Sequence, residues 1–286
     1  MDNKIAIIII SYIIFAPALL ALFSGIDRKL SARMQARVGP PLIQPIYDIL
    51  KLLEKENLVV RKSQNLYIYF FLAAIVFAGC LFFSGQNILM AIFALTLAEI
   101  FFVLGAYKAS SPYSIIGAQR ELIQMIAYEP ILILSAIGIE MLTDSFYLRD
   151  IVAYKEPLVI YLTGLFMALI FILALKFRKS PFDLSMSEHA HQELVRGITT
   201  EFSGRALAAI QIAHWYDQAI ALGFVYLFFA NNLFLGLGAV AIAYLLVIFI
   251  DNNFARFRWQ LVLKSSWIIA LVLGIGNIMF LFYLKR

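Results

Sequence analysis

The sequence predicts an all-α integral membrane protein that crosses the bilayer about eight times. Of its 286 residues, 63% are hydrophobic and only 14% are charged, whereas a soluble domain has about 45–50% apolar and about 25% charged residues. One soluble domain cannot bury so much apolar surface, so lipid must solvate most of it. We therefore expect a single integral membrane domain over residues 1–286.

Eight apolar segments are long enough to cross a membrane. A transmembrane helix needs about 20 apolar residues, and a helix satisfies its own backbone hydrogen bonds in lipid. No small-residue cleavage site follows the first segment, so it predicts a permanent anchor and not a signal peptide. The segments are 5–25, 66–84, 88–107, 115–142, 158–176, 206–230, 233–250 and 265–283.

The basic residues predict the side on which each loop lies. Most of the 23 Lys and Arg residues fall in the loops after the first, third, fifth and seventh segments. The positive-inside rule places these loops in the cytoplasm and both termini outside a plasma or inner membrane. The exceptions are Lys4, Arg149, Lys155, Lys285 and Arg286.

Two of the cytoplasmic loops, 26–65 and 177–205, are much longer than a helix connection requires, which is usually about 2–8 residues. Both combine charges with apolar residues at helical spacing, such as Ile46, Ile49 and Leu53 in the first loop. We expect short amphipathic helices that lie at the membrane interface or contact a soluble partner. The alternative is a solvated basic surface that only orients the protein.

Ionisable side chains lie within several predicted spans. A carboxylate at the centre of a bilayer costs roughly 2.5–3.5 kcal/mol, so it needs a partner, water or a proton. Acids that hold protons inside a membrane can pass them on. We therefore expect an ion path formed by Glu99, Glu121, Glu129, Glu140, His214 and Asp217.

The fourth span places its acids in a particular geometry. Glu129 and Glu140 are about three helical turns apart, so they project from nearly the same face, ~16 Å apart along the axis. Pro130 removes a backbone hydrogen bond and can admit water beside Glu129. Tyr128 and Gln124 are suitable hydrogen-bond relays. We expect Glu129 to be the central acid of the path.

Simpler explanations are open for three of these residues. Glu121 and Glu140 could lie at the two headgroup levels and be solvated there. His214 adjoins Trp215, and an aromatic cluster at the interface would explain it without titration.

No set of residues in the chain is suited to a cofactor or a metal. Cys80 is the only cysteine, while iron–sulfur centres are held by several thiolates. His189 and His191 would diverge by about 200° on a helix, so helix packing or contact with a partner is favoured over zinc. Membrane topology, and not nucleic-acid binding, explains the basic residues. We expect no catalytic, cofactor or metal site in this chain.

Three motifs resemble one known family. They resemble the membrane subunit that anchors the peripheral arm of respiratory complex I and of energy-converting NiFe hydrogenases. The motifs are Arg37-Val38-Gly39-Pro40 with Gln44-Pro45, Arg120-Glu121 with Tyr128-Glu129-Pro130, and Ser180-Pro181-Phe182-Asp183-Leu184 with Thr200-Glu201-Phe202-Ser203-Gly204.

Details of the motifs look more like the hydrogenase branch. Segment 38–43 is shorter than the Gly-rich stretch of the quinone-reducing branch, and His214 stands where that branch usually has Glu. The resemblance implies a subunit that translocates protons or sodium ions in a ferredoxin-linked hydrogenase complex. Iron–sulfur clusters and the NiFe centre are then expected in hydrogenase-like small and large subunits, with antiporter-like membrane subunits also present.

The resemblance also implies roles for individual residues. The four glutamates of the third and fourth spans would lead from a cavity beneath the peripheral subunits into the membrane. The cavity and docking surface would be lined by Arg33, Arg37, Asp48, Lys51, Arg120, Asp183, Glu188, Glu193 and Glu201.

Three alternative functions are open. The chain could be the quinone-site subunit of a complex I-like dehydrogenase or the equivalent subunit of a sulfur-reducing complex. A stand-alone secondary transporter is a different class, for which an internal repeat and helices broken at matched positions are expected. Neither feature is visible in the sequence.

Overall fold

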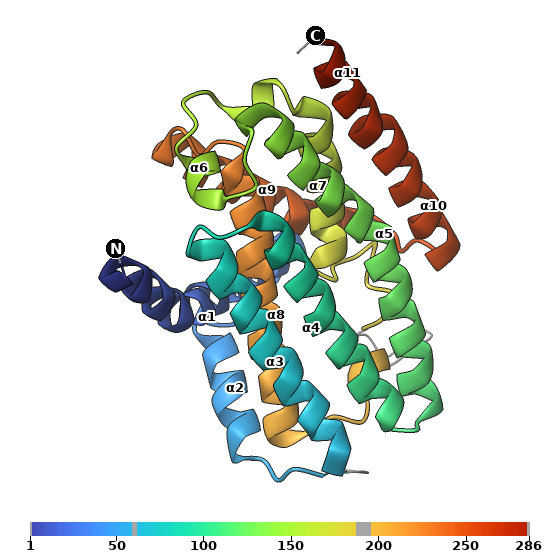
Figure 1. The fold of residues 1–286 in the computed structure, drawn as a ribbon. Coiled ribbons are helices and arrows are strands. Elements are labelled where there is room, and N and C mark those ends of the chain that lie inside the picture. Colours follow the sequence, from blue (N-terminus) through green and yellow to red (C-terminus); the bar gives the residue numbers. More distant parts are fainter. Residues whose placement is uncertain (1, 59–61, 187–195, 285–286) are drawn as a thin grey trace. The chain divides into compact units, whose positions relative to one another are not determined.

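The computed structural model describes residues 2–58, 62–186 and 196–284. Within these residues the regular structure is helical (Figure 1), which confirms the predicted all-α fold. The α-helices are α1 (Asp2–Met34), α2 (Gln44–Glu54), α3 (Lys62–Phe83), α4 (Ile88–Lys108), α5 (Pro112–Thr143), α6 (Leu148–Val152), α7 (Thr163–Lys176), α8 (Gly204–Leu227), α9 (Leu233–Asn253), α10 (Trp259–Ile269) and α11 (Gly276–Leu284). Two short 3-10 helices, η1 (Leu158–Ile160) and η2 (Gly197–Thr199), and a π-helical turn, η3 (Ala270–Ile275), complete the set.

Six of the eight predicted spans correspond to helices that are long and apolar enough to cross a membrane. The fifth prediction, 158–176, corresponds to α7, which has 14 residues and rises only ~21 Å. The sixth corresponds to α8, which has 24 residues but whose polar side chains, Asp217 among them, lower its hydropathy. The total of eight spans stays a prediction.

The first span differs from its predicted end. We expected it to end at residue 25, before Asp27 and Arg28, but α1 continues to Met34. Charged residues do not break a helix, and the nearest backbone breaks are the positive φ angles of Ala36 and Gly39. Arg33 therefore lies in the last turn of α1 and not in a loop.

The chain divides into two compact units, and α3, α4, α5 and α8 contribute residues to both. Unit 1 comprises Met1–Cys80, Ala94–Leu122 and Asp183–Ala219. Unit 2 comprises Leu81–Phe93, Ile123–Phe182 and Ile220–Arg286. The single membrane domain over 1–286 stays a prediction.

An aromatic cluster lies in the core of unit 1. The fully buried rings of Phe71 in α3 and Phe102 in α4 are stacked with their centroids 5.0 Å apart. The imidazole of His214 in α8 contacts both rings edge-on, at 5.8 Å and 5.5 Å. Aromatic pairs of this kind stabilise by about 0.5–1.5 kcal/mol beyond their area.

In unit 2 an asparagine joins α11 to the start of α7. The Asn277 amide nitrogen donates to the Tyr161 carbonyl (3.0 Å), and its oxygen accepts from the Leu165 N–H (3.2 Å). The second bond satisfies one of the backbone N–H groups that a helix leaves unpaired in its first turn.

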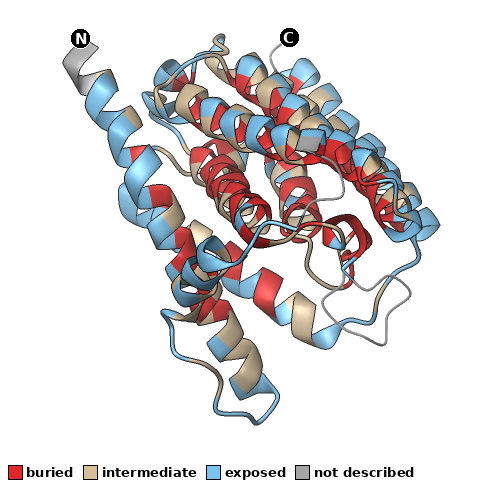
Figure 2. Ribbon diagram, turned by 90° about the horizontal axis from the view of Figure 1, so that it is seen from below, coloured by how far each residue is buried: buried red, intermediate tan, exposed pale blue. Residues whose placement is uncertain are grey.

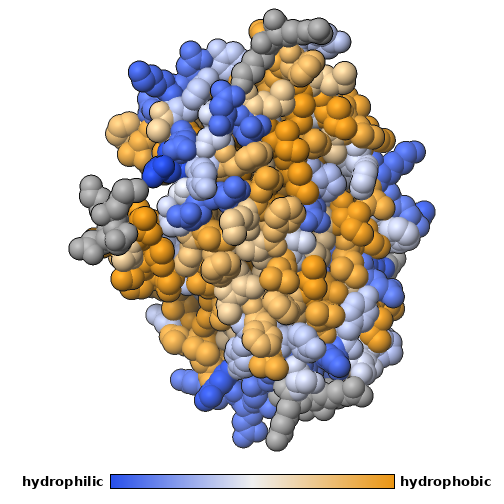
Figure 3. Space-filling model, viewed as in Figure 1, coloured by the Kyte–Doolittle hydropathy of each residue, from blue (hydrophilic) through white to orange (hydrophobic). Residues whose placement is uncertain are grey.

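Much of the helical surface is apolar and exposed. Figure 3 shows hydrophobic residues, in orange, over much of the visible face. In the candidate span Ile5–Met34, only 22% of an 18-residue apolar stretch is buried, and in Trp259–Leu284 only 17% of such a stretch is buried. Figure 2 colours each residue by its burial. A soluble monomer rarely exposes such continuous apolar surface, so these helices are suited to contact with lipid.

Candidate functional site

The first long loop folds back onto α1 within unit 1. The chain reverses at Ala36 and Gly39, whose φ angles are +56° and +76°. It then passes so close to Gly25 that a Cβ there would collide with the Leu42 carbonyl. A residue without a side chain is therefore required at Gly25.

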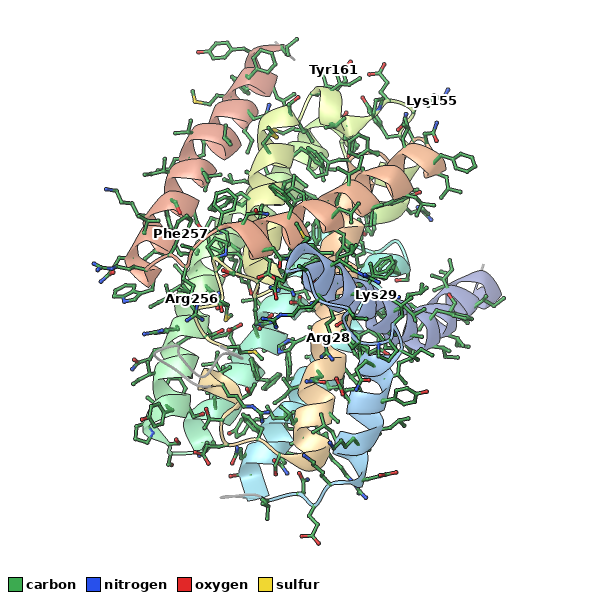
Figure 4. All side chains as sticks on the ribbon, turned by 180° about the vertical axis from the view of Figure 1, so that it is seen from behind. Arg28, Lys29, Lys155, Tyr161, Arg256 and Phe257 are labelled. Carbon is green, nitrogen blue, oxygen red and sulfur yellow. The ribbon has the colours of Figure 1, made fainter. Side chains whose placement is uncertain are left out.

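An ion pair joins this loop to α1. Arg28 Nη1 lies 2.6 Å from Asp48 Oδ2, and the Gln44 amide donates to Asp48 Oδ1 (3.1 Å). Partial burial raises the pKa of Asp48, but the hydrogen bonds from Arg28 and Gln44 lower it by more, so the pKa is below its usual value. Figure 4 labels Arg28 on α1. The sequence predicted Asp48 as a docking residue but did not predict its partner.

The other predicted docking residues of the first loop, Arg33, Arg37 and Lys51, are exposed. The predicted amphipathic helix is α2, which buries Ile49 and leaves Leu50 51% exposed. The loop therefore presents cations and apolar side chains together.

The described part of the second long loop packs on α5 within unit 1. The Ile198 N–H donates to the Ser185 carbonyl (3.0 Å), and Arg120 Nη1 donates to the Leu184 carbonyl (3.4 Å). A Cβ at Gly117 would collide with the backbone nitrogen of Ile198. The predicted docking residue Asp183 is largely buried at the start of this stretch.

The two long loops are hydrogen-bonded to each other in unit 1. The Ser203 hydroxyl lies 2.9 Å from the Leu58 nitrogen and 3.0 Å from its oxygen. The buried Gln64 amide donates to the backbone oxygen of Glu201 (3.1 Å). The structure thus brings the sequence-predicted residue Glu201 against the end of the first loop. The predicted residues Glu188 and Glu193, with His189 and His191, lie outside the described residues.

Within unit 2, the segment Lys179–Phe182 is anchored by the end of α9. Asp251 pairs with Lys179 (3.2 Å) and also accepts a hydrogen bond from the Ser180 N–H (3.0 Å). The predicted relay Gln124 donates instead to the Phe182 carbonyl. Gln124 therefore holds this loop in place, and the sequence did not predict that role.

Three ionisable groups of the predicted path are deeply buried in unit 1. Glu99, Glu121 and Asp217 expose 1%, 1% and 0% of their surface. An uncompensated charge at such a position costs several kcal/mol, so each group must hold a proton or a compensating interaction. The solvated alternative for Glu121 is therefore wrong for the conformation described.

The remaining two glutamates belong to unit 2. Glu129 and Glu140 are both half-buried in α5. Glu129, which we expected to be the central acid, is thus less buried than Glu99 and Glu121.

A buried lysine beside α5 was missed by the sequence analysis. Lys176 is only 7% exposed; its Nζ lies 3.3 Å from the Tyr128 Oη and 4.6 Å from the centroid of that ring. The position allows both a hydrogen bond and a cation–π contact. By its position in the sequence, Lys176 is an ordinary basic residue at the cytoplasmic end of a predicted span. Lys176 directly follows an apolar run in the sequence, and this position could have identified it as a buried lysine.

The sequence matches the family model described as NADH dehydrogenase over residues 5–282. The chain belongs to the NADH dehydrogenase family. Among the similar proteins is the H subunit of the NADH-quinone oxidoreductase of Anoxybacillus flavithermus, which is 32% identical over 88% of this chain and 85% of that protein. The protein of the same name from Dehalococcoides mccartyi is 28% identical over 90% of this chain and 80% of that protein.

A solved structure is also similar to this member of the NADH dehydrogenase family. It is a chain of the membrane-bound sulfane sulfur reductase, an archaeal respiratory membrane complex, with a TM-score of 0.81 and 26% identity. The match covers 96% of this chain and 99% of that one. The family resemblance drawn from the loop and helix motifs is thereby confirmed.

The close approach at Gly117 predicts a measurable destabilisation. Gly117→Ala should lower the free energy of unfolding by about 1–3 kcal/mol, because the new methyl group overpacks against Ile198. The measurement is a titration with sodium dodecyl sulfate in mixed micelles, followed by circular dichroism. The matched control is Gly238→Ala, where a Cβ meets nothing within 4 Å and helix propensity gives up to ~1 kcal/mol of stabilisation. Equal effects in the two variants would contradict the close approach.

The Arg28–Asp48 pair predicts a pH-dependent stability difference. Asp48→Asn should reduce the free energy of unfolding by roughly 0.5 kcal/mol at neutral pH, because the pair is partly exposed and screened. Since the pKa of Asp48 is lowered on folding, this stabilisation is present above the unfolded pKa of about 3.9 and is lost as the pH falls through the folded pKa. Unfolding titrations between neutral pH and about pH 3 measure it. Arg28→Gln should remove the same contribution, and a difference that grows on acidification would rule out the pair as its source.

Proposed function

We propose that this chain is the ion-translocating membrane subunit that anchors the peripheral arm of a multi-subunit oxidoreductase. The observation that carries the proposal is the burial of Glu99, Glu121 and Asp217 between apolar helices. Buried carboxyl groups reduce stability unless compensated, and ionisable groups within membrane segments generally serve ion or proton movement. The relatives that are named as subunits of an NADH-quinone oxidoreductase support the placement in such a complex.

The two long loops are the proposed docking surface. Their mutual hydrogen bonds hold them in one arrangement, while Arg33, Arg37 and Lys51 remain exposed for a partner. We assign Glu188 and Glu193 of the second loop to the same surface. A docked subunit could then move the second loop and, through Arg120, disturb its neighbour Glu121 in α5.

The chain itself holds and moves protons or sodium ions. In unit 1 the buried acids bind the ion. In unit 2 Lys176, Tyr128 and Glu129 form a second group of exchangeable sites, with Glu140 farther along α5. Lys176 Nζ and Tyr128 Oη lie within hydrogen-bond distance and can exchange a proton. Tyr128 directly precedes Glu129, so a proton at this pair is close to the next acid in sequence. His214 and Asp217 belong to the same path in unit 1.

The complex we favour is a ferredoxin-linked, energy-converting NiFe hydrogenase in a plasma or inner membrane. The supporting residues are His214, which stands where the quinone-reducing branch usually has Glu, and the Arg120-Glu121 pair. With one cysteine, this chain cannot supply the thiolates of an iron–sulfur cluster. We therefore place those clusters and the NiFe centre in the small and large partner subunits, with antiporter-like subunits as further partners and both termini of this chain outside.

A sulfur-reducing complex is the second candidate. The similar chain of the sulfane sulfur reductase is covered over 99% of its length, whereas the Anoxybacillus flavithermus protein is covered over 85%. This chain is therefore shorter than the Anoxybacillus flavithermus protein and similar in length to the chain of the sulfur-reducing complex. The quinone-site role is the third candidate. It is supported by the relatives that are named as H subunits of an NADH-quinone oxidoreductase.

The test is an acceptor assay on the complete membrane complex purified through this chain. Reduced ferredoxin is the donor, and protons, polysulfide or a quinone are offered in turn. Hydrogen evolution supports the hydrogenase; reduction of polysulfide or quinone without hydrogen evolution overturns that assignment in favour of the corresponding alternative. A chain that purifies alone and transports a solute in vesicles would overturn the anchor role itself.

Neutralising a path acid should uncouple ion movement from electron transfer. Glu121→Gln and Glu129→Gln should each reduce ion uptake per electron to below about a tenth in proteoliposomes, because an amide cannot bind and release a proton. Electron transfer and copurification of the other subunits should persist. The control is Glu156→Gln, at an exposed carboxylate that accepts a hydrogen bond from Tyr161. Unchanged ion uptake in both path variants would exclude these acids from the path.

A further inference from the structure

A basic cavity lies beside the connection between α9 and α10, within unit 2. Its volume is about 490 Å³, and it is lined by Arg256, Phe257, Arg258, Gln260, Leu261 and Lys264. The cavity is shallow and open on one side, not enclosed. Figure 4 labels Arg256 and Phe257 in the segment that joins the two helices. None of the six lining residues belongs to the proposed ion path or to the two proposed docking loops.

The position of the cavity in the sequence places it at the level of lipid headgroups. Only residues 254–258 separate the end of α9 from the start of α10. Both flanking segments, Leu233–Asn253 and Trp259–Leu284, are candidate membrane spans. A connection this short cannot extend far from the membrane surface. The basic residues of the segment predict that this is the cytoplasmic surface, where anionic lipids are enriched.

The charges of the cavity are suited to an anion. None of its six lining residues is acidic, while Arg258 and Lys264 are both exposed. The nearby carboxylate of Asp251 is paired with Lys179 at 3.2 Å and also accepts the Ser180 N–H. Guanidinium and ammonium groups form strong charge-assisted hydrogen bonds with phosphate oxygens.

The surroundings favour a phosphate that belongs to a lipid. Phe254, Trp259 and Leu261 are 53%, 39% and 51% exposed beside the cations. Tryptophan at the end of a membrane helix is typical of the headgroup level, where one side of the ring is apolar and the other is wet. A soluble anion has no use for these apolar side chains, whereas acyl chains can cover them.

We propose that this cavity binds the headgroup of an anionic phospholipid on the cytoplasmic side. Arg258 and Lys264 contact the phosphate, and the acyl chains lie along the exposed apolar faces of α9 and α10. The backbone also links the site to the Ser180-Pro181-Phe182 motif, because the Phe257 N–H donates to the Pro181 carbonyl (3.1 Å). The Phe257 ring contacts that of Phe182, with the centroids 5.7 Å apart. A bound headgroup therefore stabilises the segment that supports this motif.

The test uses the full-length chain with Trp259 as its one tryptophan, excited selectively over the tyrosines. The sequence has three tryptophans, so Trp215→Phe and Trp267→Phe leave only the one beside the cavity. The protein is reconstituted into phosphatidylcholine vesicles that contain equal mole fractions of either brominated phosphatidylglycerol or brominated phosphatidylcholine. Bromine quenches Trp259 on contact, so the two titrations give the relative association constant of the anionic lipid.

Arg258→Gln/Lys264→Gln should lower this relative association constant by up to about 25-fold. The figure corresponds to about fivefold for each charge removed, or ~1 kcal/mol for each Lys or Arg near an anionic surface. The matched control, Lys55→Gln/Lys155→Gln, removes the same charge from two other exposed positions and should change the constant less than about twofold. Circular dichroism verifies that each variant is folded, which is expected because all four side chains are exposed.

Three outcomes would overturn the proposal. One is an equal loss in the control variant, which would indicate general surface charge. Another is loss of the lipid preference when inorganic phosphate replaces chloride at constant ionic strength, which would indicate a site for a free anion. The third is a cavity variant that retains its lipid preference while the purified complex loses a peripheral subunit. That result would assign the cations to a protein partner.

Discussion

The cost of burying charge in an apolar environment is the constraint on which the structure depends. Most helices of this chain expose apolar side chains, so the few polar groups inside must be compensated. Glu99, Glu121 and Asp217 are almost completely buried, and Lys176 lies against the Tyr128 ring. A protein that only filled the membrane would gain stability by replacing these groups with apolar ones. Their presence therefore supports the proposed role in ion translocation.

The loops satisfy a different requirement, which is a fixed arrangement of segments that lie outside the long helices. Backbone carbonyls of the second loop accept hydrogen bonds from side chains of α5, and the loop contacts Gly117 directly. The first loop closes on Gly25 in a comparable way. Loops held by helix side chains transmit a displacement to those helices, and Arg120 adjoins Glu121. The chain thus has a physical means of linking an event at the proposed docking surface to a buried acid.

Local composition was sufficient to predict the all-α fold and six of the spans, because apolar length alone determines them. It was not sufficient for contacts that form between distant segments. The end of α1 was predicted too early because charge was taken as a boundary, yet Arg28 remains helical and pairs with Asp48. Lys176 could not be distinguished from a solvated lysine, since its burial depends on Tyr128 in another helix. Gln124 was expected to relay protons, and that role stays a prediction. Its hydrogen bond to the Phe182 carbonyl was not predicted, because helical periodicity does not show where a loop lies.

Asp251 connects the constraint on buried charge to the surface of unit 2. Its carboxylate accepts from both Lys179 and the Ser180 backbone, so it holds the Ser180-Pro181-Phe182 motif at the end of α9. An acid committed in this way does not neutralise Arg258 and Lys264, which lie 7 and 13 residues farther along the chain. The positive potential of that short connection therefore remains available to an anion. The same distribution of charge therefore anchors the motif and attracts an anionic headgroup. The hydrogen bond from the Phe257 N–H to the Pro181 carbonyl joins the motif to the headgroup site, so a movement of one affects the other.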